Sequence, residues 1–292
     1  MNNFRIGKTF LYFFLYISPF LLFSQTICPP SDTSKTALIL IQTPLGVIKI
    51  RLFNETPKHR DNFLKLLDSG FYDSLLFHRI IEGFMIQGGD PDSKHAAPGK
   101  TLGDGEVPGG QWIDSEFNPC LFHKRGVLAA ARESDDKNPE RKSSTCQFYI
   151  TQGKGPLNDN DLRLYEHRIN KKIRTHLRDS LLSLPQNKSL SDDRDRFRKS
   201  RMNDSLVRLD RLMDSLITPI YENTPHYTFS ESQKKQYKLE GGTPHLDGNY
   251  TVFGEVIYGM KVVDKIAAAP RDNNDRPAQD IWMKMFVLRR PK

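Results

Sequence analysis

The 292-residue sequence has only three cysteines, Cys28, Cys120 and Cys146, and no C-x-x-C pair. This count excludes the dense disulfide framework of a small secreted domain. In an exported chain Cys120 and Cys146 could form a disulfide. The alternative is that both are buried free thiols, and the sequence gives no distance that would decide between them.

Metal-binding and phosphate-binding motifs are also missing. The 8 histidines form no H-E-x-x-H or other metal-ligand spacing. The glycine-rich stretch 99–110 is not followed by a helical pattern and lacks the Gly-Lys-Ser/Thr ending of a phosphate-binding loop. We therefore expect no metal site and no cofactor.

Charge is neither scarce nor concentrated. With 37% apolar and 27% charged residues, the chain is neither a polytopic membrane protein nor wholly disordered. The net charge is +8, but acidic and basic residues interleave, so we expect no nucleic-acid partner. The length allows one large domain or two smaller ones.

The N-terminus carries a targeting pattern. Arg5 and Lys8 precede an apolar run over residues 9–23, which is shorter than the ~20 residues of a membrane-spanning helix. We interpret residues 1–24 as a signal peptide and 25–36 as a linker, and predict an exported protein of the periplasm or cell envelope. An uncleaved N-terminal anchor is the alternative and would be the only membrane attachment, unless Cys28 carries a lipid. Ile27 disfavours that lipid, because a small residue is expected there.

Two β-rich stretches flank a helical middle. Short runs rich in β-branched and aromatic residues, bounded by glycine and proline, predict strands. Thr56-Pro57 predicts a helix start and Gly70 its end, and a second helix is predicted over residues 259–268. The predicted strands cover residues 37–42, 47–53, 76–80, 84–87, 126–131, 147–151, 250–256 and 281–288.

The middle of the chain has helical periodicity instead. Apolar residues recur three or four apart over residues 162–184 and again over 202–220, with a polar stretch, 186–193, predicted as the turn between them. The simplest interpretation is a helical hairpin inserted into a β domain over residues 157–240. The insertion returns just before His245 and Leu246. It therefore either extends a binding surface there or is a solvated decoration.

The most specific pattern is FHRIIEGFMIQGGD over residues 77–90. It is followed in order by GVLAAAR (126–132), QFYIT (147–151) and LDGNYTVFG (246–254). With these four segments the sequence resembles the cyclophilin-type peptidyl-prolyl cis-trans isomerases. The resemblance implies a mainly β fold, an eight-stranded antiparallel β-barrel capped by two helices. Here the barrel would comprise residues 37–156 and 241–292, with the α-helical hairpin inserted between them.

The resemblance also implies the site. Arg79 aligns with the family's catalytic arginine, and Gln87 aligns with a residue that holds the substrate carbonyl and helps to orient that arginine. The other predicted substrate-binding residues line the proline pocket, the adjacent backbone-binding stretch or the rim: His78, Phe84, Met85, Ala131, Arg132, Gln147, Tyr149, His245, Leu246 and Tyr250.

Some of these residues have plainer interpretations. Phe84, Met85 and Leu246 could be ordinary barrel core, and His78 could belong to either the core or the site. Tyr149 and His245 stand where many relatives have phenylalanine and tryptophan, so we expect weak cyclosporin sensitivity with catalysis retained. Arg132 stands where many relatives have asparagine. The remaining histidines of interest are expected to be solvated or capping residues: His59, His123, His167, His176 and His226.

The implied activity is rotation about X–Pro bonds, which needs no nucleophile, general base or metal because no covalent bond breaks. We therefore expect a peptidyl-prolyl isomerase that acts on proline-containing segments of unfolded or partner proteins and assists the folding of exported proteins. A non-catalytic module that only captures such segments is the rival interpretation. The presence of Arg79, Phe84, Met85 and Gln87 together favours the enzyme.

Overall fold

The computed structural model describes residues 28, 32–107, 109–110 and 112–291, so the predicted signal peptide lies outside the described residues. Eight strands form one antiparallel sheet in the order β3-β4-β6-β5-β7-β2-β1-β8. The predicted fold class is confirmed. The strands are β1 (Leu38–Thr43), β2 (Gly46–Leu52), β3 (Phe77–Ile81), β4 (Met85–Gly88), β5 (Val127–Ala130), β6 (Phe148–Thr151), β7 (Val252–Tyr258) and β8 (Lys284–Arg289).

The sheet curves into a barrel whose edges meet just before β3 and β8. The Phe77 N–H donates to the Ile281 carbonyl at 2.9 Å, and the Met283 N–H donates to the Leu75 carbonyl at 2.8 Å. These bonds satisfy backbone groups that an open edge would leave unpaired.

Two helices cover the barrel as predicted. Helix α1 (Pro57–Asp68) buries Phe63, Leu64 and Leu67, and α6 (Met260–Ala267) buries Val263 and Ile266 in the main core. Thr56 occupies the N-cap position of α1, but its side chain makes no capping hydrogen bond.

Alternation along the strands gives the sheet two different apolar faces. Phe148 and Ile150 of β6 point into the barrel core, whereas Tyr149 between them belongs to a second cluster. Likewise, Ile86 of β4 points into the barrel core, whereas Met85 belongs to the second cluster. The second cluster therefore lies on the outer face of the barrel, where a ligand can reach it.

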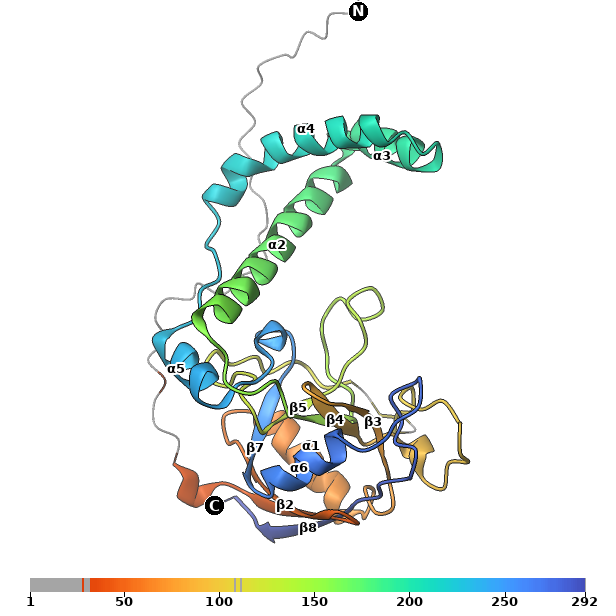
Figure 1. Ribbon diagram of the computed structural model, residues 1–292, viewed down its shortest axis with the longest axis vertical. Coiled ribbons are helices and arrows are strands. Elements are labelled where there is room, and N and C mark those ends of the chain that lie inside the picture. The colour runs from red at the N-terminus through yellow and green to blue at the C-terminus, as the bar shows by residue number, and fades with distance from the viewer. Residues whose placement is uncertain (1–27, 29–31, 108, 111, 292) are drawn as a thin grey trace, which may run out of the picture.

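The middle of the chain forms four helices: α2 (Asp159–Ser183), α3 (Lys188–Lys199), α4 (Asn203–Glu222) and α5 (Glu231–Glu240). Figure 1 shows α2 rising from the barrel, α3 and α4 at its far end, and α5 back against the barrel. Helices α2 and α4 pack together through Leu182, Leu209 and Met213, as the predicted hairpin requires. The four segments α2–α5 are called the helical insertion below.

The predicted turn over residues 186–193 is wrong, because most of it belongs to α3. Leu190 and Phe197, two turns apart, pack on the cluster of Leu182 and Met213. On the exposed side, Lys188 Nζ contacts the Asp192 carboxylate at 2.9 Å, an i,i+4 pair that stabilises a helix. Two apolar residues in a charged stretch are therefore enough for helix formation once a packing partner is present.

The cysteine pairing also differs from the prediction. Cys28 is bonded to Cys120, and Cys146 is a buried free thiol. Cys120 therefore neither pairs with Cys146 nor is free, and the Cys28 sulfur is not available for a lipid. The sequence could not show this, because the two partners are 92 residues apart.

The described part of the chain contains neither a membrane-spanning helix nor a metal-ligand cluster. There, no helix is both long and apolar enough to cross a membrane. The same residues contain no group of three or more His, Cys, Asp or Glu side chains that could hold a metal ion.

Candidate active site

A β-bulge directs Arg79 to the outer face of the barrel. Phe77 pairs with Gly88 and Arg79 pairs with Gln87, so one residue of β3, His78, is extra in the ladder. Phe77 and Ile80 both point into the core, and Arg79 would point there too if the strand alternated regularly. The bulge reverses the alternation and leaves the Arg79 side chain 43% exposed.

Three predicted residues form a hydrogen-bonded row across adjacent strands. Arg79 Nη1 donates to Gln87 Oε1 at 3.3 Å, and Gln87 Nε2 donates to Gln147 Oε1 at 3.1 Å. Gln147 Nε2 donates in turn to the carbonyls of Gly103 and Gly105, each at 2.8 Å. The Gln87 side chain is thus fixed with its oxygen towards the guanidinium.

Arg79 has an acidic neighbour that the sequence analysis missed. Its Nε lies 3.7 Å from one Asp275 carboxylate oxygen, and the other carboxylate oxygen lies 3.4 Å from Nε of Arg271. The Asp275 carbonyl accepts a hydrogen bond from the Ile80 N–H, so the loop before β8 is fixed beside β3. This pair orients the guanidinium while leaving it accessible.

The predicted proline pocket is a single apolar cluster on the outer face. Met85 and Tyr149 are buried there, 2% and 5% exposed, with Val127, Ala129, Val252 and Phe53. The structure thus brings together the predicted pocket residues on β4 and β6 with those on the loops. The partly buried members are Ile81, Phe84, Leu121, Ala131, Leu246 and Tyr250.

The Tyr149 hydroxyl is held by a buried polar chain. It lies 2.9 Å from Nε2 of His123, whose Nδ1 lies 3.1 Å from an Asp247 carboxylate oxygen. The other Asp247 oxygen accepts a 2.7 Å hydrogen bond from the Tyr237 hydroxyl of α5. Burial raises the pKa of Tyr149 and of Tyr237 well above the usual range, so both hydroxyls stay protonated donors.

The predictions for His123 and His59 are wrong, since both are buried with partners. The His59 ring lies 2.7 Å from Glu116 and 2.9 Å from the Ser143 hydroxyl. Burial lowers the His59 pKa, although Glu116 opposes this. Both histidines link segments that are far apart in sequence, and no local pattern marks such contacts.

His78 is buried, with 3% of its surface exposed, and does not belong to the apolar cluster on the outer face. Among the described residues neither ring nitrogen has a hydrogen-bond partner. Burial lowers its pKa to about 4, and the charges of Arg79 and Arg276 add to this against Asp90. The core interpretation fits His78 better than substrate contact.

The rim residues lie on two sides of the pocket. The Arg132 guanidinium is 4.6 Å from the centre of the Tyr250 ring and donates to the Asn249 carbonyl at 2.8 Å. The Ala131 N–H donates to the Gln147 carbonyl at 2.9 Å. His245, in the 3₁₀ helix η4 (Pro244–Leu246), stacks on Phe84 with centroids 5.6 Å apart.

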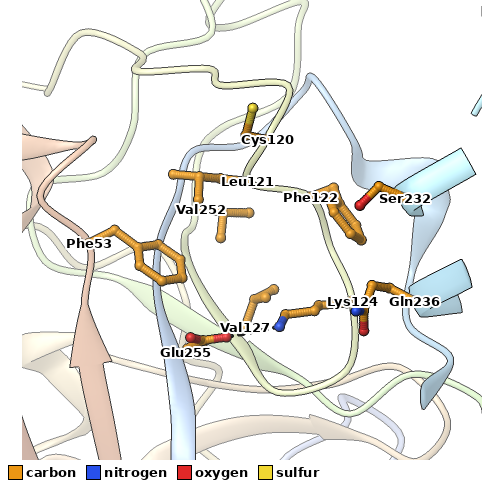
Figure 2. Close-up of a pocket in the computed structure, with 10 residues that line it drawn as sticks. All are labelled: Phe53, Cys120, Leu121, Phe122, Lys124, Val127, Ser232, Gln236, Val252 and Glu255. Carbon is orange, nitrogen blue, oxygen red and sulfur yellow. Dashed lines mark ion pairs between the residues drawn. The ribbon is translucent and has the colours of Figure 1, made fainter. Parts of the chain in front are cut away.

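A separate cavity of about 230 Å³ lies behind this cluster, between β7 and α5 (Figure 2). None of the predicted site residues lines it. Phe53, Val127 and Val252 separate it from the proline pocket, and Lys124 and Glu255 form a 2.9 Å ion pair within it. It is therefore not the predicted site.

The structure thus places an accessible arginine beside an apolar cluster on the outer face of a closed antiparallel barrel. Residues 38–169 and 223–287 match the sequence model of the family described as "Cyclophilin type peptidyl-prolyl cis-trans isomerase/CLD". The chain belongs to this family. The predicted enzyme class, peptidyl-prolyl cis-trans isomerase (EC 5.2.1.8), is confirmed with it.

Individual relatives agree with this assignment. A Streptococcus pyogenes protein, named for phosphatase and peptidyl-prolyl isomerase activities, is 29% identical over 253 residues, 86% of this chain but only 38% of that protein. The Arabidopsis thaliana peptidyl-prolyl isomerase CYP18-1 is 38% identical over 119 residues, 40% of this chain and 67% of that one. A crystal structure of a Cryptosporidium parvum cyclophilin-type peptidyl-prolyl cis-trans isomerase has a similar fold, with a TM-score of 0.50 and 21% sequence identity. The match covers 88% of this chain and 99% of that one.

The family match omits residues 170–222, which form most of the helical insertion. The predicted insertion, 157–240, therefore includes matched residues at both ends, and its boundaries stay a prediction. Helix α5 was missed in the sequence, although the Ser230-x-x-Gln233 capping box could have marked its start. Tyr237 was missed with it.

Proposed function

We propose that this chain catalyses cis/trans rotation about X–Pro bonds in segments of exported proteins and so assists their folding. The observation that carries the proposal is the Arg79 guanidinium, held 3.3 Å from Gln87 Oε1 beside the apolar cluster of Met85 and Tyr149.

The chemistry follows from the amide itself. Rotation crosses a barrier of ~18–20 kcal/mol because resonance stiffens the C–N bond. As the amide twists, its nitrogen regains a lone pair, which a guanidinium stabilises in the twisted form and not in the planar ground state. The apolar pocket holds the proline ring, Arg79 faces the nitrogen, and the Gln87 amide group orients Arg79 and the neighbouring substrate carbonyl.

The proposed export rests on two observations. Residues 9–23 are apolar and follow Arg5 and Lys8, as in a secretory signal. The Cys28–Cys120 disulfide fits an oxidising compartment and lies beyond the predicted cleavage site near Ser24. To test export, residues 1–36 are fused to an enzyme that is active only after export, with a fusion of 25–36 as the control. Export is supported if only the fusion that carries residues 1–36 is active, and it is contradicted if the two fusions are equally active.

The catalytic part is tested by NMR exchange between cis and trans peaks of an Ala-Pro tetrapeptide, with residues 25–292 as the enzyme. Faster exchange at catalytic concentrations is the expected result. Peptide binding without faster exchange would show that the barrel captures proline segments without turning them over, which is the rival function.

A further inference from the structure

The first turns of α2 lie against the rim of the proline pocket. The Tyr165 ring stacks on His245, with centroids 5.9 Å apart and planes 12° apart. His245 also stacks on Phe84, a member of the outer-face cluster. Three stacked rings thus lead from the pocket to the helical insertion, and α2 contacts η4 directly.

This part of α2 is held firmly in place. Leu162 is buried with Leu157 and Tyr237, and Asn158 forms a capping box with Asp161. About two turns further on, Asn170 donates to the Tyr227 carbonyl and accepts from its N–H. The helix therefore presents a fixed surface, which loses little conformational entropy when a peptide binds.

Two exposed cations follow Tyr165 on this part of α2. Arg168 lies with its guanidinium carbon 5.8 Å from the centre of the Tyr165 ring, and Lys172 follows one turn later; both are exposed. Within the described residues neither makes an ion pair, whereas Arg174 and Arg178 further along α2 pair with Asp214 of α4. Burial lowers the His245 pKa to about 4, His123, Lys172 and Arg168 add to this, and Asp247 opposes it.

We propose that the first half of α2 forms a wall of the substrate groove. In this arrangement Tyr165 packs against substrate residues beyond the proline, and Arg168 and Lys172 select acidic residues there. The inference rests on the proposed isomerase function. It assigns a substrate class, proline segments flanked by Asp or Glu, to a surface supplied by the helical insertion.

The test compares a bare Ala-Pro core peptide with peptides that carry two Glu, two Ala or two Lys residues either before or after the same core. NMR exchange gives kcat/KM for wild type, Arg168→Glu/Lys172→Glu and Tyr165→Ala. The matched control is Arg163→Glu/Lys171→Glu, which changes the charge equally at other exposed positions of α2.

On one side of the proline, wild type is expected to prefer Glu over Ala flanks by about threefold to tenfold, the effect of two solvent-exposed ion pairs. The charge-reversed pair should lose this preference, the control should keep it, and salt should weaken it. Tyr165→Ala should lower kcat/KM for flanked peptides more than for the bare core.

Equal preferences in wild type and the charge-reversed pair, or an equal loss in the control, would overturn the inference while leaving the isomerase activity intact. If no peptide exchanges faster with the wild-type chain, the proposed isomerase activity itself fails, and the inference fails with it.

Discussion

The hydroxyl of Tyr149, in the apolar cluster predicted to bind proline, lies 2.9 Å from Nε2 of buried His123. Through Asp247 this contact continues to Tyr237 in α5, so one hydrogen-bonded chain joins the pocket to the helical insertion. The hydroxyl that distinguishes Tyr149 from phenylalanine is therefore engaged by buried side chains of the fold and not free in the predicted pocket.

Tyr149→Phe should accordingly reduce stability more than activity. It leaves a His123 ring nitrogen buried without a partner, at a cost of about 1–3 kcal/mol in the free energy of unfolding, while the pocket keeps its aromatic ring. Urea denaturation and the NMR exchange assay measure the two effects. Tyr237→Phe is the control, because it removes the hydroxyl at the other end of this hydrogen-bonded chain, away from the pocket. A large loss of kcat/KM with unchanged stability would place the hydroxyl in catalysis instead.

Gln87→Ala should lower kcat/KM by about tenfold or more, because it removes a hydrogen bond to the charged Arg79 that is worth about 1.5–3 kcal/mol. Gln87→Glu is informative beside it, since the acid keeps the contact with Arg79 and loses the donor to Gln147. If Gln87→Ala has wild-type kcat/KM, Arg79 does not need the row of amides for its orientation.

Stability should fall in mild acid because of His78. Burial lowers its folded pKa to about 4 from 6.5, so between these pH values the unfolded chain binds a proton that the folded chain does not. Above pH 6.5 this effect costs no stability, and as the pH falls from 6.5 through 4 the folded state loses stability, by an amount on the order of a few kcal/mol.

The measurement is urea denaturation at several pH values for wild type, His78→Gln and the exposed-histidine control His167→Gln. His78→Gln should show a shallower loss of stability with acid than the other two. Parallel curves for all three proteins would contradict the assignment of this titration to His78.

Thiol labelling should distinguish the three cysteines. The native oxidised chain should react with no alkylating agent at pH 8, because Cys28 and Cys120 are bonded and burial, with Glu106 nearby, raises the Cys146 pKa to about 12. Cys28→Ser should expose one reactive thiol and Cys146→Ser none. A tryptic peptide linking Cys120 to Cys146 would show that the pairing is different.

The sequence predicted the parts of the fold that local patterns control. Runs of β-branched and aromatic residues bounded by glycine and proline located each strand to within a few residues. The motif around Arg79 and Gln87 named two residues that the structure brings into hydrogen-bond contact. The direction of the Arg79 side chain depends on the bulge at His78, which exists only once β3 pairs with β4. Likewise, Asp275, His123 and Tyr165 reach the site through tertiary contacts that leave no periodic signal.

The proposed catalysis depends most on Arg79, and its most direct test is NMR exchange of an X–Pro tetrapeptide by wild type, Arg79→Ala and Arg79→Lys. The account predicts that wild type accelerates exchange and that Arg79→Ala reduces kcat/KM at least about tenfold, equivalent to ~1.4 kcal/mol of transition-state stabilisation. Arg79→Lys should recover only part of this loss, because an ammonium lacks the planar fork of the guanidinium. Wild-type acceleration by Arg79→Ala would contradict the role assigned to this residue.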